Sequence, residues 1–242
     1  MVKRSILTAV LLGTWGLGGC GAPAPDPGRT YKPPFEDAEA KARVYQYDPA
    51  AGTAVADKTE GTLICGARLP RHSGQRQSAK AEFMLDETVY LAEARTFSFS
   101  AMVSTEWSLT LLDEHDVAFV SAEVMLENMA DPDEVYRLVM VKRLLNREGT
   151  ASDKASMETF NKTHTLPGGR RYRLTVVARA EAVTNDGRTP LHHDRWQDFT
   201  EREEDLVGES EVDPLTDAVL AADDVEAELR CTLLFFKLRP AD

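Results

Sequence analysis

The chain has 242 residues, of which 43% are hydrophobic, and its 40 acidic and 28 basic side chains give a formal net charge of -12 at pH 7. Such an acidic chain is a poor binder of nucleic acid and, apart from any lipid anchor, of anionic lipid surfaces. The apolar fraction is enough to bury a core, and the length suits one β-rich domain or two small ones.

Residues 1–19 have the three parts of a secretory signal peptide. Lys3 and Arg4 form a short positive head, residues 5–16 are apolar apart from small hydroxyl side chains, and small residues precede Cys20. A charged head, an apolar core and a small-residue cleavage site are typical of such a signal. The apolar run is shorter than the about 20 residues that a membrane span needs. We therefore expect this segment to be removed from the mature protein.

The residues around Cys20 make the prediction more specific. Leu17, Gly18, Gly19 and Cys20 resemble the lipobox of bacterial lipoproteins, in which a leucine and two small residues precede the cysteine. The resemblance implies that a signal peptidase recognises Leu17, Gly18 and Gly19 and cuts before Cys20. It also implies a diacylglyceryl group on the cysteine sulfur and often an acyl chain, such as palmitate, on the new amino terminus. Two or more chains give stable membrane anchoring where one is marginal.

The same resemblance implies a bacterial cell-envelope protein that is held in a membrane by its lipid. Gly21 stands where an aspartate would favour the inner membrane, so we expect the outer membrane, and the periplasmic or surface face stays open. Two alternatives remain for this segment. Cys20 is incidental beside an ordinary signal-peptidase site, or residues 5–19 are an uncleaved anchor.

Residues 20–40 are expected to form a tether between the lipid and the folded part. Prolines favour extended polyproline conformations and remove the backbone donors that a sheet needs. The segment has five of them: Pro23, Pro25, Pro27, Pro33 and Pro34. The remaining residues, 41–242, are expected to form a single domain.

Period-two alternation of apolar side chains dominates that domain and predicts half-buried strands. The alternation is clearest over residues 95–104, 106–112, 116–126 and 171–180. Polar or glycine-containing turns separate these stretches at residues 113–116, 130–133 and 167–169. Residues 135–145 fit either a helix or a strand, and we expect a strand because the preceding turn would form a hairpin with residues 117–126.

Many short strands with polar turns predict a mainly β protein, an antiparallel β-sandwich of eight to ten strands, Ig-like or jelly-roll-like. A few short helices are expected near the C-terminus, opening at Thr200 and at Asp213-Pro214. Residues 165–180, "TLPGGRRYRLTVVARA", resemble the start of a strand in immunoglobulin-like and carbohydrate-binding jelly-roll modules. That resemblance implies a sandwich and nothing more specific.

The two cysteines that remain after lipidation, Cys65 and Cys231, both lie in strand-like stretches. In an oxidising compartment they would make a clean pair. We therefore predict a disulfide that joins the first and last strands of the domain. The alternative is two buried free thiols, and metal binding is disfavoured because neither cysteine has a second ligand at the usual spacing.

Local catalytic motifs are missing from the sequence. It contains no GxSxG, no serine followed three residues later by lysine, no GxxxxGK[ST] and no HExxH. We accordingly expect no catalytic residue, no metal site and no cofactor, although a site assembled from distant residues stays possible.

One stretch, residues 190–199, gathers ligand-capable side chains. The candidate ligand contacts are His192, His193, Asp194 and Trp196. A tryptophan offers a flat apolar face on which a sugar or peptide can stack. Adjacent histidines on an extended strand point to opposite faces, so both would bind one ion only from a bent loop. The alternatives are a solvated polar loop and a tryptophan that caps the edge of the core.

Residues 198–228 form an acidic insertion with thirteen carboxylates and one base, Arg202. The insertion lacks the spacing and central glycine of an EF-hand loop, so a solvated, like-charged segment is expected. A loose Ca²⁺ site and a docking face for a basic partner stay open. A basic run precedes it in the chain: Arg68, Arg71, His72, Arg76 and Lys80. This run could match the acidic insertion, bind an anionic glycan, or be a solvated loop.

The sequence thus predicts a lipid-anchored, non-catalytic envelope protein that binds another envelope protein or a polysaccharide, and no nucleic acid. One alternative is a hydrolase of polysaccharide or cell wall that uses paired carboxylates from residues 198–228. Another is an accessory lipoprotein of a multi-subunit envelope or secretion machine.

Overall fold

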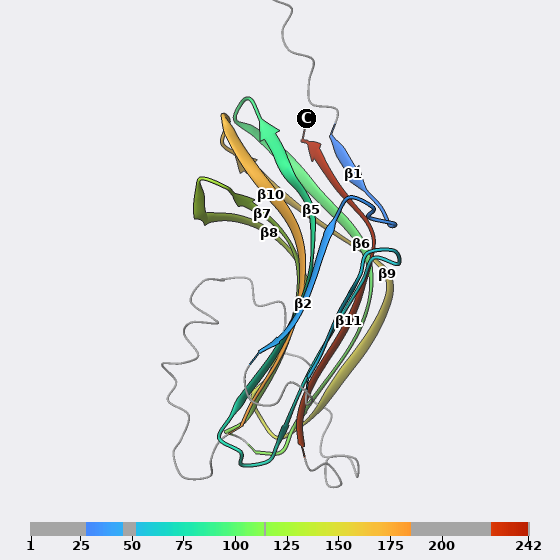
Figure 1. Ribbon diagram of the computed structural model, residues 1–242, viewed down its shortest axis with the longest axis vertical. Coiled ribbons are helices and arrows are strands. Elements are labelled where there is room, and N and C mark those ends of the chain that lie inside the picture. Colours follow the sequence, from blue (N-terminus) through green and yellow to red (C-terminus); the bar gives the residue numbers. More distant parts are fainter. Residues whose placement is uncertain (1–27, 46–51, 114, 185–223, 242) are drawn as a thin grey trace, which may run out of the picture.

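The computed structural model describes residues 28–45, 52–113, 115–184 and 224–241. All regular structure in these ranges is β-strand, and the strands form two antiparallel sheets packed as a sandwich (Figure 1). The predicted fold class is therefore confirmed. The strands are β1 (Arg29–Tyr31), β2 (Glu39–Tyr45), β3 (Gly52–Asp57), β4 (Thr62–Pro70), β5 (Arg76–Leu91), β6 (Arg95–Leu111), β7 (Val117–Asn128), β8 (Asp131–Leu145), β9 (Gly149–Leu166), β10 (Arg170–Val183) and β11 (Asp224–Pro240).

The two sheets differ in strand number. The six-stranded sheet, called sheet I below, has the order β3-β4-β11-β6-β9, and β1 pairs with β11 beyond the end of β4. The five-stranded sheet, sheet II, has the order β2-β5-β10-β7-β8. The strands of both sheets run along the long axis of the molecule (Figure 1). Among the described residues no helix is present that could cross a bilayer.

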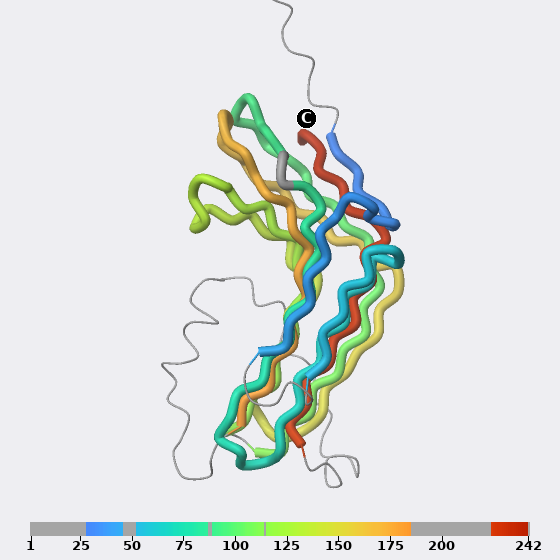
Figure 2. The backbone as a smooth tube through the Cα atoms, in the orientation of Figure 1, coloured from blue at the N-terminus to red at the C-terminus, as the bar shows by residue number. Residues whose placement is uncertain are grey.

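The chain passes repeatedly from one sheet to the other. It leaves sheet I after β4 and enters sheet II at β5, and Figure 2 shows this crossing at the lower end of the molecule. The last strand, β11, pairs with both β4 and β6, which lie far from it in the sequence. Because neighbours in a sheet come from distant parts of the chain, the sandwich is stabilised mainly by non-local pairings.

Strand β6 shows how alternation of side chains builds the core. Every second residue from Phe97 to Leu111 points inward and is at most 6% exposed. The sequence predicted two strands here, over residues 95–104 and 106–112. They form one strand of 17 residues, because the alternation continues without a break through Thr105.

Strand β11 keeps its apolar side chains inside by means of a β-bulge. Leu229 and Leu233 point inward before an irregularity that lies between Leu233 and Phe235. Phe236 and Leu238 point inward after it. A bulge adds one residue to one strand, so it reverses which residues face the core. The ring of Phe236 meets Phe99 edge to face at 5.8 Å between centroids, the geometry that aromatic pairs prefer.

The hairpin of β7 and β8 confirms the strand predicted over residues 135–145. Its turn is shorter than expected, because β8 already begins at Asp131 and Asn128 pairs with that residue. Pro132 is therefore a strand residue and not a turn residue. It is tolerated because β8 is an edge strand, where a missing backbone donor costs little.

The other two predicted turns are present between strands. Asp116 closes the turn after β6 by donating its N–H to the carbonyl oxygen of Asp113 at 3.1 Å. The turn between β9 and β10 requires a glycine, because a Cβ atom at Gly168 would lie 2.5 Å from the backbone nitrogen of Ala94.

The expected boundary between tether and domain is wrong by about a dozen residues. Residues 29–31 form β1 on sheet I, and β2 begins at Glu39 on sheet II. Between the two strands Phe35 and Ala38 are buried at 6% and 7% exposure. The prolines at 33 and 34 therefore connect two strands of the domain. Residues 20–27 lie outside the described residues, as do both helices predicted near the C-terminus.

Candidate functional site

Most of the predicted site residues lie outside the described part of the chain. This holds for Leu17, Gly18, Gly19 and Cys20 at the predicted lipidation site. It also holds for the candidate ligand contacts His192, His193, Asp194 and Trp196. Lipidation and ligand binding at these residues therefore stay predictions.

The predicted disulfide is not formed, and Cys65 and Cys231 are both free and buried. The two cysteines lie on the paired strands β4 and β11, but Cys65 stands opposite Leu229 and Cys231 opposite Leu63. They are diagonal neighbours, about 7–8 Å apart in a ladder, whereas a disulfide needs Cβ atoms about 3.8 Å apart. The Sγ of Cys65 instead donates to the carbonyl oxygen of Ala178 at 3.2 Å.

Burial also makes the two thiols unreactive. Removal from water raises the pKa of Cys65 and that of Cys231 to about 12, because a buried thiolate loses its hydration. The cysteines thus serve as small apolar side chains between the sheets. Elsewhere in the described ranges, no group of three or more His, Cys, Asp or Glu side chains is placed to hold a metal ion.

The basic run of the sequence is divided between the two sheets. Arg68 lies on β4 of sheet I, where its Nε is 2.5 Å from Asp224 and 3.2 Å from Glu226. Arg76 and Lys80 lie on β5 of sheet II. The match with the acidic insertion, which the sequence left open, thus exists at Arg68 for the described part of that insertion.

The outer face of sheet I carries a shallow depression of about 470 Å³, called the sheet I depression below. Gly66 on β4, which has no side chain, is one of its lining residues. A Cβ atom there would be in ordinary van der Waals contact with Thr53, 3.5 Å from its Cβ, so it fits without a clash beside the depression. Two rows of residues in cross-strand register line the depression. The first is Thr53, Gly66, Glu228, Ser108 and Ser152, and the second is Ile64, Arg230, Glu106 and Lys154.

The sheet I depression offers both hydrogen-bond donors and acceptors to solvent. Glu106, Glu228 and Arg230 are exposed, and Glu106 accepts a hydrogen bond from Lys154 Nζ at 3.0 Å. Hydroxyl groups of Ser108 and Ser152 lie beside these charges in the neighbouring row. Carboxylates, cations and hydroxyls within one open concavity suit a ligand that itself has many hydroxyl groups.

The outer face of sheet II has a different character, because two of its carboxylates are buried. Glu123 on β7 is 4% exposed, and both of its oxygens accept from Nη1 of Arg137, at 2.9 and 2.8 Å. A second guanidinium, that of Arg179, lies 3.8 Å from the same carboxylate. Glu181 on β10 pairs with Arg76, yet burial raises the pKa of Glu181. Charged pairs of this kind stabilise the face without leaving their carboxylates open to a ligand.

A second depression, of about 580 Å³, lies where the N-terminal segment packs against β5. Asp86 on β5 accepts from Arg29 Nη1 at 2.5 Å and from the hydroxyl of Tyr31 at 3.0 Å. Burial raises the pKa of Tyr31 to about 12. The three side chains fasten β1 of sheet I to β5 of sheet II, so we interpret this depression as a structural seam.

Sequence reasoning missed the sheet I depression because its residues come from all five strands of the main path of sheet I. Each strand contributes one or two outward side chains, and none forms a local motif. Two weak signals were present in the sequence. Gly66 is a glycine inside a strand, which often marks a place where a ligand comes close to the backbone. Strand β6 has serine at several of its outward positions, among them Ser98, Ser100, Ser104 and Ser108.

No protein-family model matches the chain, and no curated protein matches its sequence. One similar solved structure is the module TmCBM61 in complex with β-1,4-galactotriose, with 8% identity over 85% of this chain and 90% of that chain and a TM-score of 0.22. A second is infectious bursal disease virus, Gx strain, with 11% identity over 97% of this chain and 41% of that chain and a TM-score of 0.24. A third is a family 29 carbohydrate-binding module, with 9% identity over 62% of this chain and 96% of that chain and a TM-score of 0.19. These TM-scores are too low to carry an argument about fold or function.

Proposed function

We propose that the protein is a lipid-anchored, non-catalytic polysaccharide-binding module of the bacterial envelope, and that the sheet I depression is its binding site. The observation that carries the binding proposal is the depression beside Gly66, bordered by exposed charged and hydroxyl side chains. The anchoring proposal rests on the sequence around Cys20 alone.

The width of the depression suits an extended sugar chain. Neighbouring strands lie about 4.8 Å apart, so a row across the five strands spans about 19 Å. Sugar hydroxyls donate to carboxylates and accept from cations and hydroxyls, and the two rows supply both kinds of group. An extended glycan lying across the strands along the second row would contact Arg230, Glu106 and Lys154 in turn.

Hydrolysis is less well supported than binding. A glycosidase needs one carboxyl that stays protonated, which burial in an apolar site provides, beside a second carboxylate. The carboxylates of the depression, Glu106, Asp153 and Glu228, are all exposed, and Glu106 is paired with Lys154. The described residues therefore favour a site that holds a polymer without cleaving it.

The binding proposal is tested by filling the depression. Gly66→Tyr places a large side chain in the depression, at a position where an aromatic residue suits a strand. Binding to soluble peptidoglycan fragments, mannan and galactan is measured by biolayer interferometry, and Gly66→Ala is the matched control. We expect at least one of these glycans to bind, Gly66→Tyr to weaken that binding at least tenfold, and Gly66→Ala to keep it within twofold. Binding that Gly66→Tyr leaves unchanged, or no binding to any of the three glycans, would contradict the proposal.

The anchoring proposal has a separate test in the producing cell. Cys20→Ser removes the only sulfur that the lipobox can modify. We expect the variant to lose labelling by radioactive palmitate and to move from the membrane to the soluble fraction. A variant that stays in the membrane would count against the lipid anchor and in favour of an uncleaved apolar segment.

A further inference from the structure

The lower half of the outer face of sheet II is positively charged, although the whole chain carries a net charge of -12. This half comprises the rows in register with residues 76–84 of β5. It has seven cations and only four carboxylates. Each carboxylate has a cation beside it, in the pairs Glu39 with Lys41, Glu82 with Lys80, Glu123 with Arg137, and Glu181 with Arg76.

The three cations outside these four pairs all fall in one cross-strand row, and one of them, Arg179, also lies 3.8 Å from Glu123. They are Arg43 on β2, Arg179 on β10 and Lys142 on β8. The register places Lys80 on β5 between Arg43 and Arg179, opposite both. We call Arg43, Lys80, Arg179 and Lys142 the cationic row. Adjacent strands are about 4.8 Å apart, so the first three cations follow one another at this spacing.

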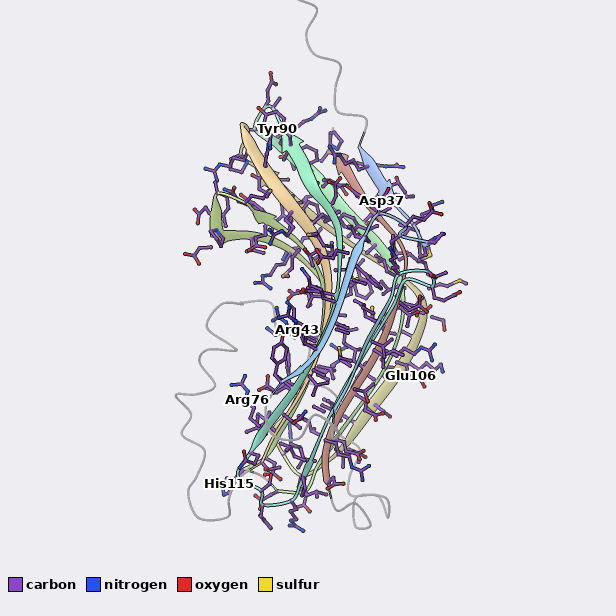
Figure 3. All side chains as sticks on the ribbon, viewed as in Figure 1. Asp37, Arg43, Arg76, Tyr90, Glu106 and His115 are labelled. Carbon is purple, nitrogen blue, oxygen red and sulfur yellow. The ribbon has the colours of Figure 1, made fainter. Side chains whose placement is uncertain are left out.

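Most of the cationic row is open to solvent. Arg43 is exposed on an edge strand, and the side chains of Arg179 and Lys80 are 44% and 31% exposed. Lys142 is 8% exposed and has a contact within the fold, so it contributes charge from below the surface. Figure 3 shows Arg43 and Arg76 on one side of the molecule and Glu106, from the sheet I depression, on the other.

An exposed aromatic side chain adjoins the cationic row. Tyr45 lies on the same face of β2 as Arg43, two residues further along, and is 39% exposed. An aromatic ring of this kind can stack on the apolar face of a sugar. Cations that follow one another across strands, with an aromatic ring at their end, match a polymer that carries both sugar rings and anionic groups.

We propose that the cationic row is a second binding site, for an extended acidic polysaccharide. This inference goes beyond the function proposed for sheet I and concerns the opposite face of the sandwich. The anionic groups of the ligand would be carboxylates or sulfates, because an arginine guanidinium binds either in a bidentate manner. A protein partner fits less well, since protein interfaces have an apolar centre and the exposed part of the cationic row is charged.

The position of the row also favours a polymer over a lipid surface. The described chain begins at Gly28, next to β1, at the end of the sandwich where β1 and the C-terminus lie together (Figure 1). Arg170 is at this end, and Arg179 lies nine residues further along β10. At about 3.3 Å per residue the cationic row is about 30 Å from the end that would face the membrane.

The test uses the mature chain with Cys20→Ser and biolayer interferometry on immobilised polymers. Polygalacturonate supplies carboxylates, dextran sulfate supplies sulfates, neutral dextran is the uncharged reference and poly-L-glutamate represents an acidic protein. We expect binding to at least one acidic polysaccharide that weakens as salt is added, because salt screens exposed charges. We further expect Arg43→Gln with Lys80→Gln to weaken it at least tenfold, and Tyr45→Ser to weaken it severalfold.

Two controls distinguish binding at the cationic row from an effect of overall charge and from binding at the sheet I depression. Lys32→Gln with Arg147→Gln makes the same charge change at exposed positions away from the row, and it should alter binding less than twofold. Gly66→Tyr should also alter it less than twofold, so failure here and failure of the proposed function are distinguishable. No binding to either acidic polysaccharide, equal weakening by the control pair, or binding to neutral dextran or poly-L-glutamate as tight as to the acidic glycans would overturn the inference.

Discussion

The outer faces of the two sheets have the same strand geometry but different surfaces. Sheet I presents serines, exposed charges and an open concavity, whereas sheet II has two carboxylates, Glu123 and Glu181, that are nearly buried beside arginine side chains. Both faces are built from the outward half of an alternating pattern whose inward half is the common core. The difference teaches that the inward residues determine the sandwich, while the outward residues are free to form either a ligand site or a network of ion pairs.

The largest difference in solvent exposure is between the two faces of sheet I. Its outer face is open to solvent, and its inner face is buried against sheet II. Cys65 and Cys231 point inward with a pKa of about 12, against 9.0 for an ordinary cysteine. The thiolate fraction, and with it the rate of alkylation, should therefore be about a thousandfold lower in the folded protein than in the unfolded chain. Mass spectrometry after iodoacetamide treatment of the Cys20→Ser variant measures this.

The same experiment checks that no disulfide is present. Denaturation without a reductant should make both thiols react at once. Two cysteines that stay unlabelled under these conditions would mean that a disulfide joins them, and the diagonal register of β4 and β11 would have to be different.

The next contrast concerns the buried ion pair of sheet II. Glu123→Ala removes the carboxylate that accepts two hydrogen bonds from Arg137 and lies 3.8 Å from Arg179. We expect the free energy of unfolding to fall by about 2–3 kcal/mol, as for the loss of a buried hydrogen-bonded charge whose partner can still reach water. Urea unfolding followed by circular dichroism measures the change. A loss below about 0.5 kcal/mol would show that the two faces do not differ in this respect.

A smaller effect is expected from Glu181, whose pKa burial raises above the usual 4.5. The folded protein then holds this proton more tightly than the unfolded chain does. The contribution of Glu181 to stability is complete below the unfolded pKa and is lost as the pH rises through the folded pKa. Above pH 4.5 the free energy of unfolding should therefore fall less steeply with increasing pH in Glu181→Gln than in the unsubstituted protein. Urea unfolding at several pH values between 4 and 7 tests this, and an unchanged slope would contradict it.

The smallest effect is expected on sheet I. Glu106 and Lys154 are paired at 3.0 Å, but their side chains are 55% and 69% exposed. Exposed pairs contribute little, so Glu106→Gln should change the free energy of unfolding by less than about 0.5 kcal/mol. Binding of the glycan that the sheet I depression selects should nevertheless weaken. A variant that loses stability and keeps binding would reverse the roles assigned to the two faces.

The alternation of apolar and polar side chains made the fold class predictable. The prediction was best for strands that have one face buried in the core. In β6 each inward residue is apolar apart from Thr105, so its strand character was plain from the sequence. Strand β1 could not be predicted, because three residues show no alternation and the prolines beside them indicate an extended tether. Its place depends on pairing with Leu238, more than 200 residues further along the chain.

The candidate sites were less predictable than the fold. The sheet I depression and the cationic row are defined by register between strands that are distant in sequence, and register is set by packing. Arg43 and Lys80, for example, are 37 residues apart in the sequence and opposite each other in the sheet. For the cysteines the adjacent strands could be guessed, but a shift of two residues along the ladder separates a disulfide from two free thiols.

The short pairing of β1 has a mechanical consequence. Tension applied at the amino end reaches β1 first, and that strand is held by three residue pairs, the contacts of Asp86 and the stacking of Tyr31 on Phe236. If Phe35 and Ala38 then leave the core as well, residues 29–38 add about 35 Å of extended chain while β2 remains in sheet II. Under a pulling force the domain can thus lengthen at its amino end before the two sheets of the sandwich begin to separate.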